Sequence, residues 1–211
     1  SMKTPAGLGV RMAASLFYPD DEPRTKSVTV EQIDRLTLAA SQAWLEKVIK
    51  ECPLEIAIVG DLPKARALEL AAHYLGALPS RPRIGPETFK GIRTLKRPAG
   101  PRTFEAEIET PTKQAFVMSG FYGADQSNLA DARALNMASR VLSTRMTTEV
   151  REKAQLVYSI GASARAATTF PGFGVFGASA PIEPSKTQPL VEKLASMYAE
   201  FAKNGPTEEE M

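Results

Sequence analysis

Hydrophobic and polar positions follow a helical period in four stretches of the chain. Apolar residues recur three and four positions apart over residues 29–51, 61–76, 128–153 and 189–204, which predicts amphipathic helices. Thr29 and Gln32 form a capping-box pattern at the start of the first stretch, which we expect to hold two short helices with one buried face. The second stretch is expected to be capped by Asp61 and to end at Gly76.

The segments between these stretches follow the patterns of strands. Residues 54–59 are rich in β-branched side chains and lie between Pro53 and Gly60, which predicts an interior strand. Alternation over residues 103–109 and an apolar run over 114–122 predict a hairpin. Three more strands are expected at 13–17, 155–164 and 172–180, the last two joined by a turn around Phe170-Pro171-Gly172.

The order of the predicted elements is helix, strand, helix, two strands, helix, two strands, helix. Strands in one layer, with amphipathic helices packed on one face, indicate an α+β fold with a mixed, largely antiparallel sheet in the style of a split βαβ unit.

Both ends of the chain bear on its domain organisation. Ser1 precedes a methionine, which is typical of a tag scar, so we expect residues 1–27 to be a scar with an irregular lead-in. Thr207 and Glu210 form a capping box that should open a helix. We therefore expect a single domain over residues 28–211, truncated at the start of its last helix.

Composition excludes several functional classes. The 26 basic and 24 acidic residues give a formal charge of +2, so there is no bulk attraction to nucleic acid or to an anionic membrane. No apolar run approaches the roughly 20 residues that span a bilayer, so no membrane span is expected. Cys52 is the only cysteine, which excludes an intrachain disulfide.

The residue clusters needed for metal or nucleophilic catalysis are missing from the sequence. His73 is the only histidine and falls on the polar side of its predicted helix, so we expect a surface residue and no metal site. The glycine-rich residues 172–177 lie in a predicted strand and do not precede a helix, so they are no phosphate loop. Glycine in a strand indicates that another backbone or an extended ligand approaches closely.

A basic stretch between residues 79 and 102 leaves one alternative function open. A free-standing ferredoxin-like nucleic-acid binder would use residues 81–102, and its binding to single strands would be salt-sensitive. Phe89 is the only aromatic residue there, and stacking on aromatic rings is what such binders use. We therefore expect a solvated connector and no nucleic-acid partner.

Several segments form a recognisable set by their order and spacing along the chain. They are Leu54 to Asp61, Tyr74 to Pro79, Val150 to Lys153 with Leu156 to Ser159, the Gly-Phe-Gly strand, and Gly205 to Thr207. Together they resemble the pitrilysin/insulinase family of zinc metallopeptidases. The resemblance implies a metallopeptidase-type α/β roll in one half of a clamshell. It also implies a zinc motif, H-x-x-E-H, in an early domain. This chain lacks that motif, so zinc is expected in the parent protein and no cofactor in this chain.

The resemblance also implies a pair of substrate-binding residues. In the family an arginine and a tyrosine seven residues apart hold the peptide near the scissile bond, and Arg151 and Tyr158 match that spacing. A guanidinium can donate to peptide carbonyls, and a phenol can donate to a developing oxyanion. By themselves the two residues also fit a solvated helix end and an ordinary strand aromatic. Relatives commonly have glycine where this chain has Gln155, which would be strained if the position needs a positive φ.

The function implied by the resemblance is that of a non-catalytic, substrate-binding domain of a zinc-dependent endopeptidase. It would complete the peptide-binding chamber opposite a zinc domain absent from this chain, and the fragment alone would be inactive. Its expected partners are a peptide or unfolded polypeptide substrate and the zinc-bearing domain of the same parent. The alternative is a structural or assembly domain of a catalytically inactive member, which an H-x-x-E-H motif upstream in the parent would disfavour.

Overall fold

The structure is a computed structural model that describes residues 4–81, 83–111 and 113–210. The chain divides into two compact units. Ser1–Lys26 and Ile92–Met211 form what we call the main unit, and Ser27–Gly91 form the helical unit. Arg151 and Tyr158 belong to the main unit, whose architecture therefore decides how they are presented.

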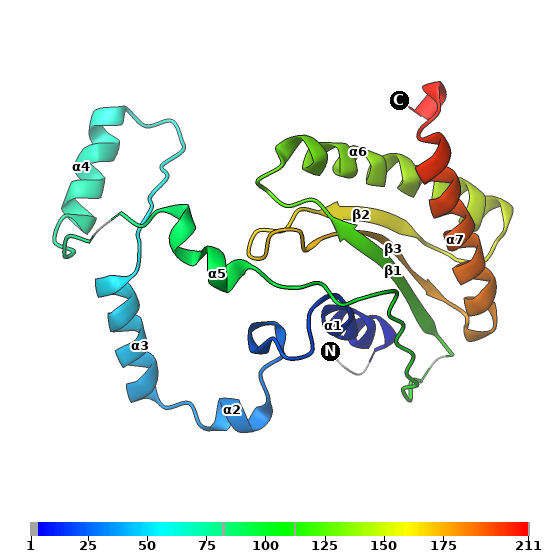
Figure 1. Cartoon of the computed structure of the whole chain (residues 1–211), viewed down its shortest axis with the longest axis horizontal. Coiled ribbons are helices and arrows are strands. Elements are labelled where there is room, and N and C mark those ends of the chain that lie inside the picture. The colour runs from blue at the N-terminus through cyan, green and yellow to red at the C-terminus, as the bar shows by residue number, and fades with distance from the viewer. Residues whose placement is uncertain (1–3, 82, 112, 211) are drawn as a thin grey trace. The chain divides into compact units, whose positions relative to one another are not determined.

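A three-stranded antiparallel sheet forms the centre of the main unit (Figure 1). Strands β1 (Ala115–Gly123) and β2 (Gly161–Arg165) both pair with β3 (Gly174–Ile182), which gives the order β1-β3-β2. The turn before β3 passes through Gly172 at a φ of 77°, a conformation that glycine adopts without steric strain. The α+β class and the antiparallel sheet predicted from the sequence are confirmed.

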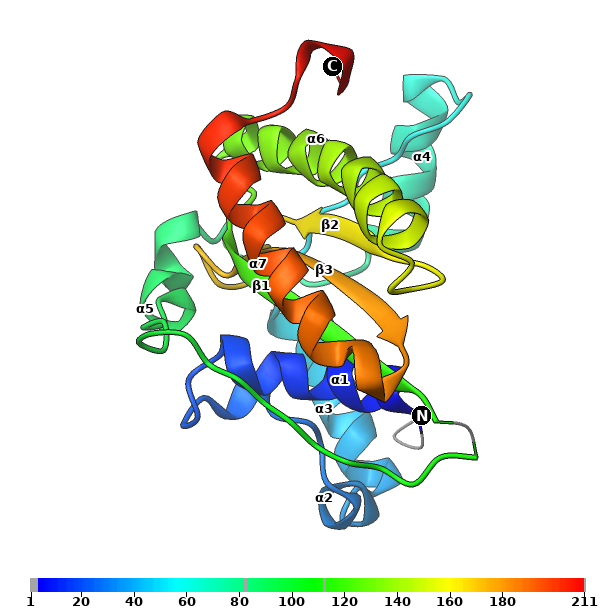
Figure 2. The ribbon, with the colours of Figure 1, turned by 90° about the vertical axis from the view of Figure 1, so that its right-hand side faces the viewer.

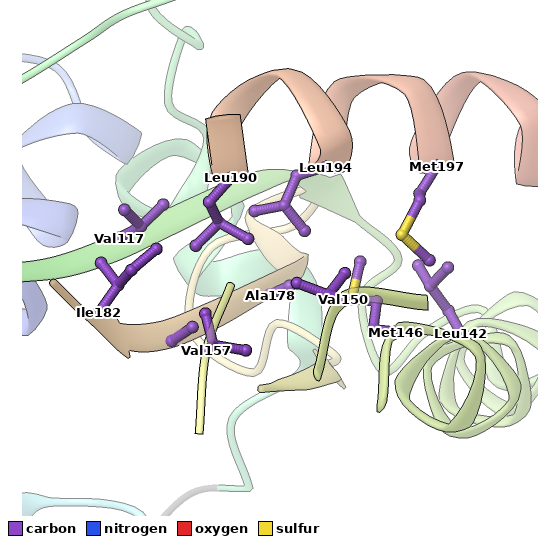
Figure 3. Close-up of a cluster of buried hydrophobic side chains, with 11 residues drawn as sticks. Val117, Leu142, Met146, Val150, Val157, Ala178, Ile182, Leu190, Leu194 and Met197 are labelled. Atoms are coloured by element: carbon purple, nitrogen blue, oxygen red, sulfur yellow. The ribbon is translucent and has the colours of Figure 1, made fainter. Parts of the chain in front are cut away.

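Two long helices cover one face of this sheet (Figure 2). They are α6 (Leu129–Met146), which Asn128 caps by accepting the N–H of Asp131, and α7 (Thr187–Asn204), which ends at Gly205. Their apolar sides meet the sheet in one core (Figure 3). The core residues are Val117, Leu142, Met146, Val150, Val157, Ala178, Ala180, Ile182, Leu190, Leu194 and Met197. Burial of each large aliphatic side chain contributes about 1.5–3 kcal/mol.

A further helix, α1 (Pro5–Phe17), packs against β1 on the opposite face. Tyr122 points away from the face that carries Val117, because strand residues alternate. Its hydroxyl donates to the carbonyl of Phe17 at 2.6 Å, and the two rings meet edge-on. The strand predicted at 13–17 is therefore wrong. Thr4 accepts the N–H of Gly7 and a proline follows it, and these start signals favour a helix over a short apolar run.

The glycines of β3 allow the backbone of neighbouring segments to approach closely. A Cβ atom added to Gly177 would lie 2.1 Å from the carbonyl oxygen of Ser119, and one added to Gly174 would lie 1.9 Å from that of Ala124. The close backbone approach that the glycine-rich strand predicted is confirmed.

The helical unit contains α2 (Val30–Asp34), α3 (Leu38–Glu51) and α4 (Lys64–Leu75). The capping box of Thr29 and Gln32 is formed, and the first helical stretch divides into two helices as predicted. α4 is followed by the expected Gly76, but Pro63 precedes it and no side chain caps it, so Asp61 is not its cap. None of the three helices contains a buried residue, so the predicted burial of one face is wrong. A short 3-10 turn (Pro86–Phe89) and the single turn α5 (Lys90–Arg93) follow.

Two more predicted strands do not form. Residues 54–59 lie outside regular structure, and Val59 is 96% exposed. Residues 103–109 are also outside the sheet, so the predicted hairpin is wrong and only its second arm is a strand, β1. A strand gains its stability from neighbours, and the described part of the helical unit offers no strand with which residues 54–59 could pair.

Candidate functional site

Arg151 lies on a π-helical turn, Thr147–Lys153, that continues α6. The N–H of Ala154 donates to the carbonyl of Glu149, five residues back, at 3.2 Å. A π turn holds more residues than an α turn and changes the direction of the side chains that follow it. Val150 is completely buried beneath the turn, whereas Arg151 is exposed. The buried valine therefore anchors the turn while the guanidinium points to solvent.

Gln155 reverses the chain after this turn. Its φ is 52°, the only positive φ at a residue other than glycine in the described ranges. The N–H of Leu156 donates back to the carbonyl of Val150 at 3.1 Å, and Nζ of Lys186 donates to the carbonyl of Gln155 at 3.4 Å. A left-handed backbone costs a non-glycine residue about 1–2 kcal/mol. Gln155 therefore occupies the strained conformation that was anticipated for it.

A bulge at the edge of the sheet turns Tyr158 outward. Val157 bridges Ile182, while Gly161 pairs with Ser179. Residues 158–160 therefore lie opposite only two residues of β3, which is the pattern of a β-bulge. Val157 is 8% exposed and Tyr158 is 85% exposed. Bulges commonly re-aim a side chain next to a functional site, and this one places the phenol in solvent.

The structure brings Arg151 and Tyr158 together. Cζ of Arg151 lies 5.5 Å from the centroid of the Tyr158 ring, a cation–π contact of about 0.5–1 kcal/mol at an exposed site. In the part of the chain that the structure describes, neither side chain has a hydrogen bond or an ion pair. The guanidinium donors and the phenol hydroxyl are thus available to a ligand. Their role in substrate binding stays a prediction.

Glu149 lies on the same turn, two residues before Arg151, and its carboxylate already has partners. It accepts from Nζ of Lys153 at 2.7 Å and from Nζ of Lys193 at 3.4 Å. The hydrogen bond from Lys153, more than any other contact, holds the pKa of Glu149 below its usual range. This carboxylate therefore pairs with the two lysines, and the Arg151 guanidinium stays free for a ligand.

Metal ligands do not gather in the described residues. No group of three or more histidine, cysteine, aspartate or glutamate side chains there could hold a metal ion. His73 is exposed near the end of α4, where its ring meets that of Tyr74 edge-on, with the centroids 4.8 Å apart. In the same described ranges, no helix is long and apolar enough to cross a bilayer.

Sequence reasoning missed the arginines that tie the loops of the main unit together. Arg93 donates to two backbone carbonyls of the β2–β3 turn at 2.8 and 3.0 Å. Arg97 lies over the ring of Tyr122, with Cζ 4.6 Å from the centroid, and Arg102 donates to Asp20 at 3.0 Å. Residues 92–102, the part of the expected solvated connector that belongs to the main unit, are therefore fastened to that unit. In the sequence, only the basic composition of this stretch pointed to these arginine contacts.

Glu210 makes a second unforeseen contact. Its carboxylate accepts Nε of Arg145 at 2.8 Å and the N–H of Thr207 at 2.8 Å. The second bond is one half of the capping box predicted for Thr207 and Glu210. The Arg145 hydrogen bond is the main reason why the pKa of Glu210 falls to about 2.

The fold and the exposed pair describe an α+β domain in which no described residues form a metal centre. A family model for the peptidase M16 inactive domain matches residues 35–211. The chain belongs to this family, which confirms the relationship predicted from its sequence motifs. No curated protein gives a significant match.

Solved structures share the fold of the chain. A peptidase M16 inactive domain from Pseudomonas fluorescens is 24% identical, with a TM-score of 0.77 over 99% of this chain and 49% of that one. A mutant of the ferredoxin protease FusC, in complex with Arabidopsis ferredoxin, is 14% identical, with a TM-score of 0.67 over 98% of this chain and 22% of that one. A conserved protein from Enterococcus faecalis is 17% identical, with a TM-score of 0.62 over 97% of this chain and 46% of that one. The chain thus spans about half of the first and third proteins and less of the second.

Proposed function

We propose that this chain is a non-catalytic, substrate-binding domain of a zinc-dependent endopeptidase. It completes a peptide-binding chamber opposite a zinc-bearing domain of the same parent, and Arg151 and Tyr158 hold the peptide. The observation that carries the proposal is the pairing of these two side chains, exposed and without other polar partners in the described residues.

Each side chain of the pair has a distinct chemical role. The guanidinium of Arg151 is planar and always charged, so it donates to one or two peptide carbonyls and orients the chain. The hydroxyl of Tyr158 donates to a carbonyl oxygen as negative charge develops there, which lowers the barrier to peptide hydrolysis. The ring of Tyr158 also restrains the guanidinium, because the two are already in contact.

Zinc belongs to another domain of the parent in this proposal. The described residues of this chain do not suit the ion, since no three potential ligands come together. The ferredoxin protease among the structural neighbours was solved with a protein bound to it, which supports a polypeptide as the substrate class for this chain as well.

The proposal is tested by peptide cleavage with the full-length parent. Cleavage of a quenched fluorescent peptide should be abolished by a zinc chelator. Tyr158→Phe should lower kcat/KM about 10²–10³-fold, the usual loss when one oxyanion donor is removed. Arg151→Ala should raise KM. Tyr74→Phe and Arg133→Ala, which change exposed residues elsewhere, serve as matched controls.

Unchanged kinetics in both site variants would remove the pair from substrate binding. A parent that never cleaves peptides would instead favour a structural or assembly role for the domain.

A further inference from the structure

A polar hollow lies where the turn between β2 and β3 meets the segment that leaves β1. It is lined by Arg93, by three residues that follow β1 (Asp125–Ser127) and by three residues of the β2–β3 turn, all of them in the main unit. Its volume of about 260 Å³ is just below the range of roughly 300–1,000 Å³ found for small-molecule sites. The hollow therefore suits a functional group of a larger ligand.

Hydrogen bonds join the two walls of the hollow. Asp125 and Ala167 form an isolated parallel bridge. The N–H of Gln126 donates to the carbonyl of Ala167 at 3.0 Å, and the N–H of Ala167 donates to the carbonyl of Ala124 at 3.1 Å. The N–H of Gly172 donates to the Asp125 carboxylate at 2.9 Å. The hollow is thus formed before a ligand arrives, which lowers the ordering cost of binding.

The guanidinium of Arg93 is held in place and keeps unused donors. Its Nε and Nη2 donate to the carbonyls of Thr169 and Thr168. Within the described residues this side chain has no further hydrogen bond and no ion pair. A guanidinium has five N–H donors, so Nη1 and its charge are available to an anion.

The carboxylate of Asp125 also lines the hollow, but its oxygens already have partners. One oxygen accepts from the N–H of Ser127 at 2.9 Å and from the Ser127 hydroxyl, and the other accepts from Gly172. The hydrogen bond from the Ser127 side chain is the first reason why the pKa of Asp125 lies below its usual value. This negative charge opposes a multiply charged ligand, so a singly charged anion in direct contact with Arg93 suits the hollow best.

Two uncharged side chains of the lining add donors. In the part of the chain that the structure describes, neither the hydroxyl of Thr168 nor the side-chain amide of Gln126 has a hydrogen bond. Both groups can donate to an oxygen. A carboxylate is a singly charged anion with two oxygens, and it matches the planar fork of an arginine.

We propose that this hollow binds a carboxylate group of the polypeptide substrate, with Arg93 as its main donor. The inference rests on the proposed function, because it takes the ligand to be part of a polypeptide. The carboxylate belongs to an acidic side chain or to the C-terminus, which offer the same two oxygens. The hollow follows the end of β2, whereas Tyr158 precedes its start. The domain thus selects substrates by an acidic group that lies away from the bond to be cleaved.

NMR titration of the ¹⁵N-labelled chain with three peptides tests the site. Each peptide is acetylated and has eight residues that alternate glycine and serine, apart from one central position. The first has a central glutamate and a C-terminal amide, the second a central glutamine and a free C-terminus, and the third a central glutamine and an amide. The backbone amides of Ser127, Ala167 and Thr168 should shift with the first or the second peptide. The Kd should be at least about tenfold lower than for the third, because hydrogen bonds to a charged group are lost there.

A protein variant provides the second measurement. Arg93→Gln should weaken binding of the carboxylate peptides at least about tenfold. Lys203→Ala, which removes an exposed cation near the end of α7, is the matched control and should leave their affinity unchanged. The comparison of the three peptides uses the unaltered chain, so it stays decisive even if Arg93→Gln loosens the turn.

The outcomes separate the carboxylate site from the proposed function. Binding of the first peptide alone supports the site with an acidic side chain as ligand, and binding of the second alone supports it with the C-terminus. Equal affinity of all three peptides, or no shift at the three amides, overturns the site. If it is overturned while Arg151→Ala and Tyr158→Phe still impair cleavage by the parent, the proposed function stands. If the carboxylate peptides bind and both variants cleave normally, the site stands and the proposed function falls.

Discussion

Replacing Gln155 with glycine should stabilise the main unit, against the usual effect of adding glycine to a chain. Gln155 has a φ of 52° and ends the π turn that carries Arg151. Its side chain is exposed, and its one contact with Lys186 uses the backbone carbonyl. Gln155→Gly therefore relieves the backbone strain and removes little packing.

The magnitude follows from two opposing terms. Relief of the left-handed conformation contributes about 1–2 kcal/mol. The greater freedom of glycine in the unfolded chain opposes it by about 0.5–1 kcal/mol. The free energy of unfolding should therefore rise, by no more than about 1.5 kcal/mol. For a domain of this size, the Tm should rise by no more than about 6 °C.

Thermal unfolding followed by near-UV circular dichroism of the tyrosines measures this change. Ala154→Gly is the matched control, because Ala154 has an ordinary φ of −83°, and it should lose about 0.5–1 kcal/mol. Gln155→Ala keeps the Cβ atom and should stay within about 0.5 kcal/mol of the starting protein. If Gln155→Gly lowers the Tm as Ala154→Gly does, the turn is not strained and the reasoning fails.

Two further predictions concern the sheet and the Arg145–Glu210 pair. Gly177→Ala should destabilise the main unit by about 1–3 kcal/mol through overpacking. Gly161→Ala is the control and should change the stability little, because the nearest atom to its added Cβ, Oγ of Ser143, would lie 3.6 Å away. Equal losses of stability in urea unfolding would contradict this prediction. The pKa of Glu210 is lowered from 4.5 to about 2 in the folded state, so its stabilising contribution is complete above about pH 4.5 and is lost as the pH falls toward 2. Glu210→Gln should therefore lower the Tm at pH 7 and match the starting protein below pH 2, and a constant difference across this range would refute the assignment to the Arg145 pair.

The sequence predicted correctly those elements whose hydrophobic period and end residues are both visible in it. The apolar stripe of α7 and the turn at Gly172 lie where they were expected. Residues 54–59 and 103–109 carry an equally clear strand pattern, yet neither is a strand. Period alone does not supply a partner, and the described part of the helical unit offers residues 54–59 no strand with which to form a hydrogen-bonding ladder.

The candidate site was predictable in its residues and less so in its geometry. The seven-residue spacing and the family resemblance singled out Arg151 and Tyr158, whereas the π turn and the β-bulge have no local sequence signal. Gln155 is the exception, because its place in the motif anticipated the positive φ that the structure has. α1 was missed although the cap and proline at its start were visible in the sequence.

The two site residues each follow a buried valine, Val150 before Arg151 and Val157 before Tyr158. Both valines belong to one hydrophobic core. The packing of that core therefore sets the distance between the guanidinium and the phenol. Close packing transmits changes in side-chain volume through such a core. Under the proposed function, exchanges of apolar residues that never contact the substrate would therefore alter how tightly it is held, and a comparison of relatives restricted to polar surface positions would overlook those changes.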